Sequence, residues 1–125
     1  MGLDEFLRNF DFKAQKDMKI DSKELIKLLK NGEAILVDVR FREEYEVWNI
    51  KPSVNIPLNE LPDRWEELKG INKLIVVACP HSQRSAIAMT YLLSKGIKTK
   101  FLADGLLTMV NLLKGEAVKD FLKNC

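Results

Sequence analysis

Cys79 is the residue of this chain most clearly placed to be reactive, because of the residues around it. It ends an apolar run and opens the segment Cys-Pro-His-Ser-Gln-Arg-Ser, after which a helical pattern begins. The start of a helix offers unpaired backbone N–H groups and the positive end of its dipole, and together these bind anions. Such surroundings favour a thiolate over a thiol, and Arg84 adds a permanent positive charge. The pattern predicts a nucleophilic Cys79 held in an anion-binding loop.

The loop after Cys79 is the predicted substrate-binding and anion-binding segment. Its members are Pro80, His81, Ser82, Gln83, Arg84 and Ser85. A cysteine that only closes a buried strand is the alternative interpretation, but a core cysteine needs no polar loop. His81 either donates a hydrogen bond and adds charge, or is a solvent-exposed loop side chain. One histidine and one cysteine are too few ligands for zinc, so no metal site is predicted.

A parallel α/β sheet is the framework expected to position this loop. Short apolar runs typical of buried strands occur at residues 34–39, 53–57, 73–79 and 98–103. Helical patterns alternate with them at residues 21–31, 42–48, 61–70, 84–94, 104–114 and 116–123. This alternation predicts three layers, with a central parallel sheet covered by helices on both faces. Cys79 then lies beyond the carboxyl end of a central strand, where ligands bind in such sheets.

Asp38 and Arg40 are predicted to support the site. They end the strand at residues 34–39, so they share the sheet edge at which Cys79 lies. A structural role is the favoured interpretation, and direct contact with substrate is the alternative.

The first sixteen residues form a separate element. Leu3, Phe6, Leu7 and Phe10 have the spacing of one helical face, so residues 1–16 are predicted to be an amphipathic helical extension and residues 17–125 the main domain. The favoured interpretation packs this face on the domain's own core. A homodimer contact through the extension and the binding of another partner are the alternatives.

Composition indicates a globular protein. The chain has 125 residues, of which 46% are hydrophobic, and a net charge of +2 with interleaved signs, which gives no reason to expect nucleic acid or a membrane as partner. No apolar run approaches the ~20 residues of a membrane span. The two cysteines, Cys79 and Cys125, lie far apart, so we expect free thiols and a cytoplasmic location. Cys125, at the chain end, is expected to have no function.

Three motifs together resemble the rhodanese-like, or sulfurtransferase, family over about residues 19–114. They are Asp38-Val39-Arg40 with Glu44-Tyr45, then Val54-Asn55-Ile56-Pro57-Leu58, then Cys79-x4-Arg84-Ser85-x-x-Ala88 with Gly105 in a late turn. The resemblance implies a rhodanese-like fold and transfer of sulfane sulfur through a persulfide on Cys79. It also implies no cofactor, a small sulfur-containing anion or a persulfide donor protein as donor, and a thiol or cyanide as acceptor. The four residues between Cys79 and Arg84 match these sulfurtransferases, whereas the related dual-specificity phosphatases have five.

Three departures from that pattern bear on activity. Pro80 stands where active members usually have arginine, and proline has no N–H to donate. Ser82 replaces a glycine, which is a source of strain if that position needs a positive φ. Trp48-Asn49-Ile50 replaces Gly-His-Ile. The alternative function is therefore a catalytically weak rhodanese-like module that binds a partner or regulates one.

Overall fold

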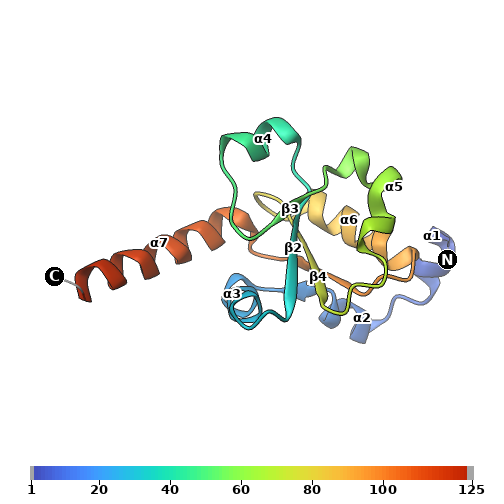
Figure 1. Cartoon of the computed structure of the whole chain (residues 1–125). Helices are drawn as coiled ribbons and strands as arrows, with labels where there is room; N and C mark the ends of the chain where they lie inside the picture. The colour runs from blue at the N-terminus through green and yellow to red at the C-terminus, as the bar shows by residue number, and fades with distance from the viewer. Residues whose placement is uncertain (1, 124–125) are drawn as a thin grey trace.

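Five parallel strands form one sheet in the computed structural model (Figure 1), which describes residues 2–123 and the side-chain surroundings of residues 2–115. The strands are β1 (Lys19–Ile20), β2 (Ala34–Asp38), β3 (Val54–Asn55), β4 (Leu74–Ala78) and β5 (Thr99–Leu102). Their order across the sheet is β1-β5-β4-β2-β3, and every neighbouring pair is parallel. The predicted α/β architecture is confirmed, and β4 is the central strand.

The helices are α1 (Leu3–Arg8), α2 (Phe12–Asp17), α3 (Ser22–Lys30), α4 (Arg42–Val47), α5 (Leu61–Arg64), α6 (Gln83–Ser94) and α7 (Gly105–Lys123), with single-turn 3₁₀ segments at Leu58–Glu60 and Trp65–Leu68. Helices α3 to α6 connect successive strands, whereas α1 and α2 precede the sheet and α7 follows it. Local sequence explains their ends. Asp21 caps α3 by accepting a hydrogen bond from the Glu24 N–H at 2.9 Å, and Gly32 follows that helix with a φ of +70°.

Two apolar cores, one on each face of the sheet, make the three layers. Leu36, Val76 and Leu102 point to the face covered by α3 and α7, where Leu25 and Met109 meet them. Val37, Val77 and Cys79 point to the opposite face, where α6 supplies Met89 and Leu92. Alternation along each strand thus assigns Cys79 to the α6 side. Among the described helices, none has the length and hydropathy needed to cross a bilayer.

The structure differs from the sequence-based elements and boundary in five places. The extension forms two helices, because Asp11 starts α2 by accepting the Ala14 N–H at 2.8 Å. The helix predicted at residues 61–70 changes to 3₁₀ geometry at Trp65, while the two predicted at residues 104–123 are one helix. β1 was not predicted, since two residues carry no periodicity. The proposed boundary between residues 16 and 17 lies one residue before the end of α2.

Candidate active site

Cys79 lies directly after the central strand, at the point where the chain turns toward α6. Its side chain is only 2% exposed, at the floor of the loop formed by residues 80–84. Ser82 precedes the first residue of α6, so the helix starts within the loop. The φ of Ser82 is −146°, so this position does not need the positive φ that would favour glycine.

Ser85 is the residue that contacts the sulfur. Its backbone N–H donates to Cys79 Sγ at 3.4 Å, and the thiol S–H donates to Ser85 Oγ at 3.5 Å. The hydroxyl of Ser85 in turn donates to the Ser82 carbonyl at 3.0 Å and is fully buried. A donor from the first turn of α6 therefore points at the reactive atom, as anion binding requires.

The start of α7 holds the loop from the other side. The Leu106 N–H donates to the Cys79 carbonyl at 2.9 Å, and the Leu107 N–H donates to the Pro80 carbonyl at 3.4 Å. Gly105, with a φ of +81°, packs so tightly that a Cβ there would lie 2.2 Å from the Pro80 carbonyl oxygen. Sequence patterns marked Gly105 as part of a motif but did not reveal this close approach or the two bonds.

A second contact, missed from the sequence, fixes the turn before α7. Asp104 accepts hydrogen bonds from both the backbone N–H of Ser22, at 3.0 Å, and its hydroxyl, at 2.8 Å. Ser22 opens α3 and is fully buried. The start of α3 thus anchors the turn that supports the Cys79 loop, and a separation of 82 residues hid this pairing from sequence patterns.

Arg84 is held by Glu44 rather than pointing free into the loop. Its guanidinium makes two parallel bonds to the carboxylate, at 2.6 and 3.0 Å, and stacks 5.6 Å from the centre of the Phe41 ring. The hydrogen bond raises the pKa of Arg84 and lowers the pKa of Glu44. Glu44 also accepts the Phe41 N–H at 3.0 Å, so one carboxylate joins the starts of α4 and α6. Its charge offsets much of the positive charge predicted for the loop.

Glu44→Gln is expected to lower the free energy of unfolding and to reduce its pH dependence. Because Arg84 lowers the pKa of Glu44, this stabilisation is complete above the unfolded carboxyl value of about 4.3 and is lost as pH falls through the lower folded value. The side chains of Arg84 and Glu44 are 28% and 35% exposed, so solvent screening keeps the effect modest.

Urea unfolding at about pH 7 and about pH 3 measures the effect of this substitution. The difference between wild type and Glu44→Gln should be present at the higher pH and shrink at the lower one. Glu43→Gln, an exposed neighbour on α4, is the matched control and should show no such change. A difference of equal size at both pH values would contradict the assigned ion pair.

Asp38 and Arg40 form a buried pair beside the loop after β2. Arg40 is 1% exposed, and its Nε and Nη2 donate to the Asp38 carboxylate at 3.0 and 2.8 Å. Arg40 Nη2 also donates to the Trp48 carbonyl at 2.7 Å, and its guanidinium lies 4.0 Å from the Trp48 ring centre. Asn55 bonds the Asp38 and Arg40 carbonyls, both at 3.0 Å. These contacts brace the loop that carries Phe41 and Glu44.

The remaining loop residues lie nearer the surface. His81 and Gln83 are exposed, whereas Pro80 and Ser82 are partly buried. The structure therefore places the Ser85 N–H and hydroxyl at the Cys79 sulfur, directs Arg84 to Glu44, and leaves His81 and Gln83 facing solvent. Within the described part of the chain, no three His, Cys, Asp or Glu side chains gather as a metal site.

Comparison with known proteins identifies relatives of this arrangement. A family model described as "Rhodanese-like domain" matches residues 21–111. The thiosulfate sulfurtransferase GlpE of Pseudomonas syringae is 32% identical over 77 residues, which cover 62% of this chain and 72% of that protein. A solved rhodanese-related protein from Thermoplasma volcanium is 29% identical with a TM-score of 0.68, over 74% of this chain and 90% of that one.

A larger relative contains a similar region. The HTH-type transcriptional regulator Rv0324 of Mycobacterium tuberculosis is 38% identical over 86 residues, which are 67% of this chain but only 38% of the regulator. This chain therefore matches well under half of that protein's length.

Proposed function

This chain belongs to the rhodanese-like domain family, and we propose that it is a sulfurtransferase that carries sulfane sulfur as a persulfide on Cys79. One observation carries the proposal: the Cys79 sulfur accepts the Ser85 N–H at the start of α6, in a loop with the family's spacing to Arg84. Similarity to the thiosulfate sulfurtransferase GlpE supports the same reaction class. The first sixteen residues and the rest of the chain take the roles of extension and sulfur-transfer domain.

The reaction consists of two displacements at sulfur. The Cys79 thiolate attacks the sulfane sulfur of a donor, an Sγ–S bond forms, and the donor's S–S bond breaks with its electron pair leaving on the donor, for example as sulfite from thiosulfate. An acceptor thiolate or cyanide then attacks the outer sulfur and releases the Cys79 thiolate. Sulfane sulfur moves between the two partners, and the chain ends in the state in which it began.

Ser85 is the residue we expect to stabilise the sulfur anion. In the thiol state its hydroxyl accepts the S–H while donating to Ser82. Once the proton has left for solvent, the backbone N–H of Ser85 remains directed at the sulfur, and rotation of the hydroxyl supplies a second donor. Both donors come from a buried first turn and need no rearrangement of the backbone.

The donor is either a small sulfur-containing anion such as thiosulfate or a persulfide donor protein, and the loop favours the protein. Pro80 removes one N–H, and Glu44 occupies the guanidinium of Arg84. A free dianion therefore meets fewer donors and less positive charge than a cysteine followed by arginine would offer. Acceptor thiols abound in the cytoplasm, where Cys79 also stays reduced, so we propose that location.

A partner-binding or regulatory module is the second candidate function. Two observations favour it: Pro80 has no N–H, and the positive charge of Arg84 is offset by Glu44. Such a loop is poorer at stabilising negative charge on sulfur. The two candidates differ in one measurable property, which is whether Cys79 accepts sulfur.

Intact-mass spectrometry of the purified protein tests the proposal. After incubation with thiosulfate, or with a cysteine desulfurase and cysteine, we expect a gain of one sulfur mass that dithiothreitol removes. Greater loading from the desulfurase than from thiosulfate supports a protein donor. If neither donor adds sulfur to folded protein, the chain is a binding module and sulfur transfer is wrong.

A further inference from the structure

Exposed apolar side chains are concentrated on the N-terminal extension. Nine large hydrophobic residues of the described chain are exposed, and four of them, Leu3, Leu7, Phe10 and Phe12, lie in α1, α2 and their connection. Leu3, Leu7 and Phe12 are 60%, 59% and 70% exposed, and none of the six residues of α1 is buried. An apolar patch of this density on a small domain marks an interaction surface.

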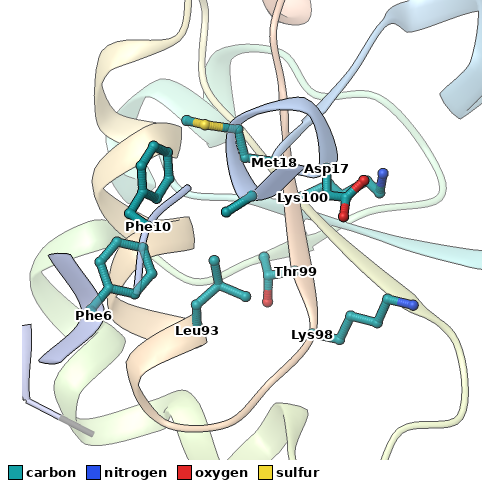
Figure 2. Close-up of a pocket in the computed structure, with 9 residues that line it drawn as sticks. Phe6, Phe10, Asp17, Met18, Leu93, Lys98, Thr99 and Lys100 are labelled. Carbon is teal, nitrogen blue, oxygen red and sulfur yellow. The ribbon is translucent and has the colours of Figure 1, made fainter. Parts of the chain in front are cut away.

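The extension packs only partly on its own domain. Phe6 and Phe10 turn toward the body, with ring centres 5.9 Å apart, and line a hollow of about 350 Å³ that also has Leu93 and Thr99 in its wall (Figure 2). The stripe therefore does not pack on the core as a whole, and only Phe6 and Phe10 face the body, across this hollow. Leu3 and Leu7, on the adjoining side of the stripe, face outward.

We propose that a second copy of this chain covers this surface and forms a two-fold symmetric dimer through α1. The proposal is independent of sulfur transfer. Apolar and charged residues repeat four positions apart in α1, as Leu3-Asp4 and Leu7-Arg8. When two such helices lie antiparallel about a two-fold axis, Leu3 of each meets Leu7 of the other, and Asp4 of each meets Arg8 of the other. The helix is thus complementary to itself in both shape and charge.

Helical geometry allows the Leu3–Leu7 and Asp4–Arg8 contacts to form at the same time. Positions 3 and 7 share one face, positions 4 and 8 lie together at its flank, and Glu5 points to the opposite side, at about 100° per residue. Glu5 is therefore directed to solvent. In this arrangement the Glu5 carboxylates of the two copies do not meet at the two-fold axis. Phe10 borders both the hollow and the outward face, so the second copy also closes the mouth of the hollow.

Other occupants fit less well. The chain's own α7 extends from the opposite side of the body, far from α1 (Figure 1). An anionic membrane would meet two acidic residues and one basic residue on α1, which gives no electrostatic attraction. The dimer also leaves the active site open, because the hollow lies at the start of β5, whereas Cys79 follows the carboxyl end of the parallel strand β4.

Sedimentation velocity over a range of protein concentrations tests the proposal. We expect wild type to dimerise reversibly, and the double substitution Leu3→Glu with Leu7→Glu to weaken association on the order of a hundredfold, because it places carboxylates opposite each other at the centre. Val47→Glu, at an 81% exposed apolar position on α4, is the matched control and should still dimerise. Circular dichroism should show all three proteins folded, and sulfur loading of Cys79 should be unchanged in the double variant.

A charge exchange tests the antiparallel register. Asp4→Arg alone should weaken the dimer about tenfold, and adding Arg8→Asp should restore it to within about twofold of wild type. A wild-type protein that stays monomeric, a dimer that Leu3→Glu with Leu7→Glu leaves intact, or binding to phosphatidylglycerol vesicles by a monomeric wild type would each overturn the proposal. Failure of the charge exchange to restore association would overturn the antiparallel arrangement.

Discussion

Cys79→Ser is expected to abolish sulfur loading completely. The serine oxygen is smaller than sulfur but takes the same position, where it can keep the hydrogen bonds to the Ser85 N–H and hydroxyl, so the loop should retain its shape. A hydroxyl of unperturbed acidity is scarcely ionised at neutral pH, and its oxygen cannot hold a sulfane sulfur that an acceptor could remove. The expected effect is therefore total loss of the added sulfur mass, with the free energy of unfolding changed by only about 1 kcal/mol.

Intact-mass spectrometry after incubation with the donor that loads wild type best measures this effect. Cys125→Ser is the control, because Cys125 lies outside the described residues and has no predicted role. This variant should load as wild type does. Undiminished loading of Cys79→Ser would contradict Cys79 as the sulfur carrier, and a loss in both variants would show that the two thiols act together.

The reactive loop was predictable because the signals that specify it are local. A continuous apolar run ends at Cys79, polar residues follow, and a helical period starts near Arg84, all within about one strand, one loop and one turn of helix. The local pattern of apolar and polar residues is therefore enough to place the thiol near the start of α6. The same reasoning predicts the α3 cap at Asp21, because the capping side chain and its N–H partner are only three residues apart.

The partners of the loop were not predictable because they are far away along the chain. Arg84 meets a carboxylate 40 residues earlier, and Ser22 meets Asp104 across 82 residues. Without those contacts the sequence presents Arg84 as a free cation for substrate, whereas the structure assigns its guanidinium to Glu44. The break between α1 and α2 escaped prediction for a different reason. The apolar spacing continues through residues 9–11, and only the cap made by Asp11 shows that a new helix begins.

The loop around Cys79 depends on backbone packing more than on its own side chains. Of its residues, His81 and Gln83 face solvent, and Ser82 contributes its carbonyl to Ser85. The carbonyls of Cys79 and Pro80 instead accept hydrogen bonds from N–H groups at the start of α7, where Gly105 also packs closely against the Pro80 carbonyl. Gly105 is consequently the position at which the smallest change should disturb the site most.

Gly105→Ala is expected to destabilise the chain and impair sulfur loading together. Its φ of +81° costs an alanine about 1 kcal/mol, and the added methyl would lie 2.2 Å from the Pro80 carbonyl oxygen and 2.7 Å from that of His81. Both obstacles are backbone atoms, so either the loop or the start of α7 must move. We expect a loss of roughly 2–5 kcal/mol in the free energy of unfolding and a large drop in the rate of sulfur loading.

Gly96→Ala separates the steric contact from the backbone strain. Gly96 has a φ of +82°, almost the same as that of Gly105, but nothing lies within 4 Å of a Cβ built there. This control should therefore lose only about 1 kcal/mol, measured by urea unfolding, and load sulfur at the wild-type rate. The difference between the two variants then reports the collision with the loop alone. If Gly105→Ala matched Gly96→Ala in both stability and loading rate, the start of α7 would not be what holds the Cys79 loop in place.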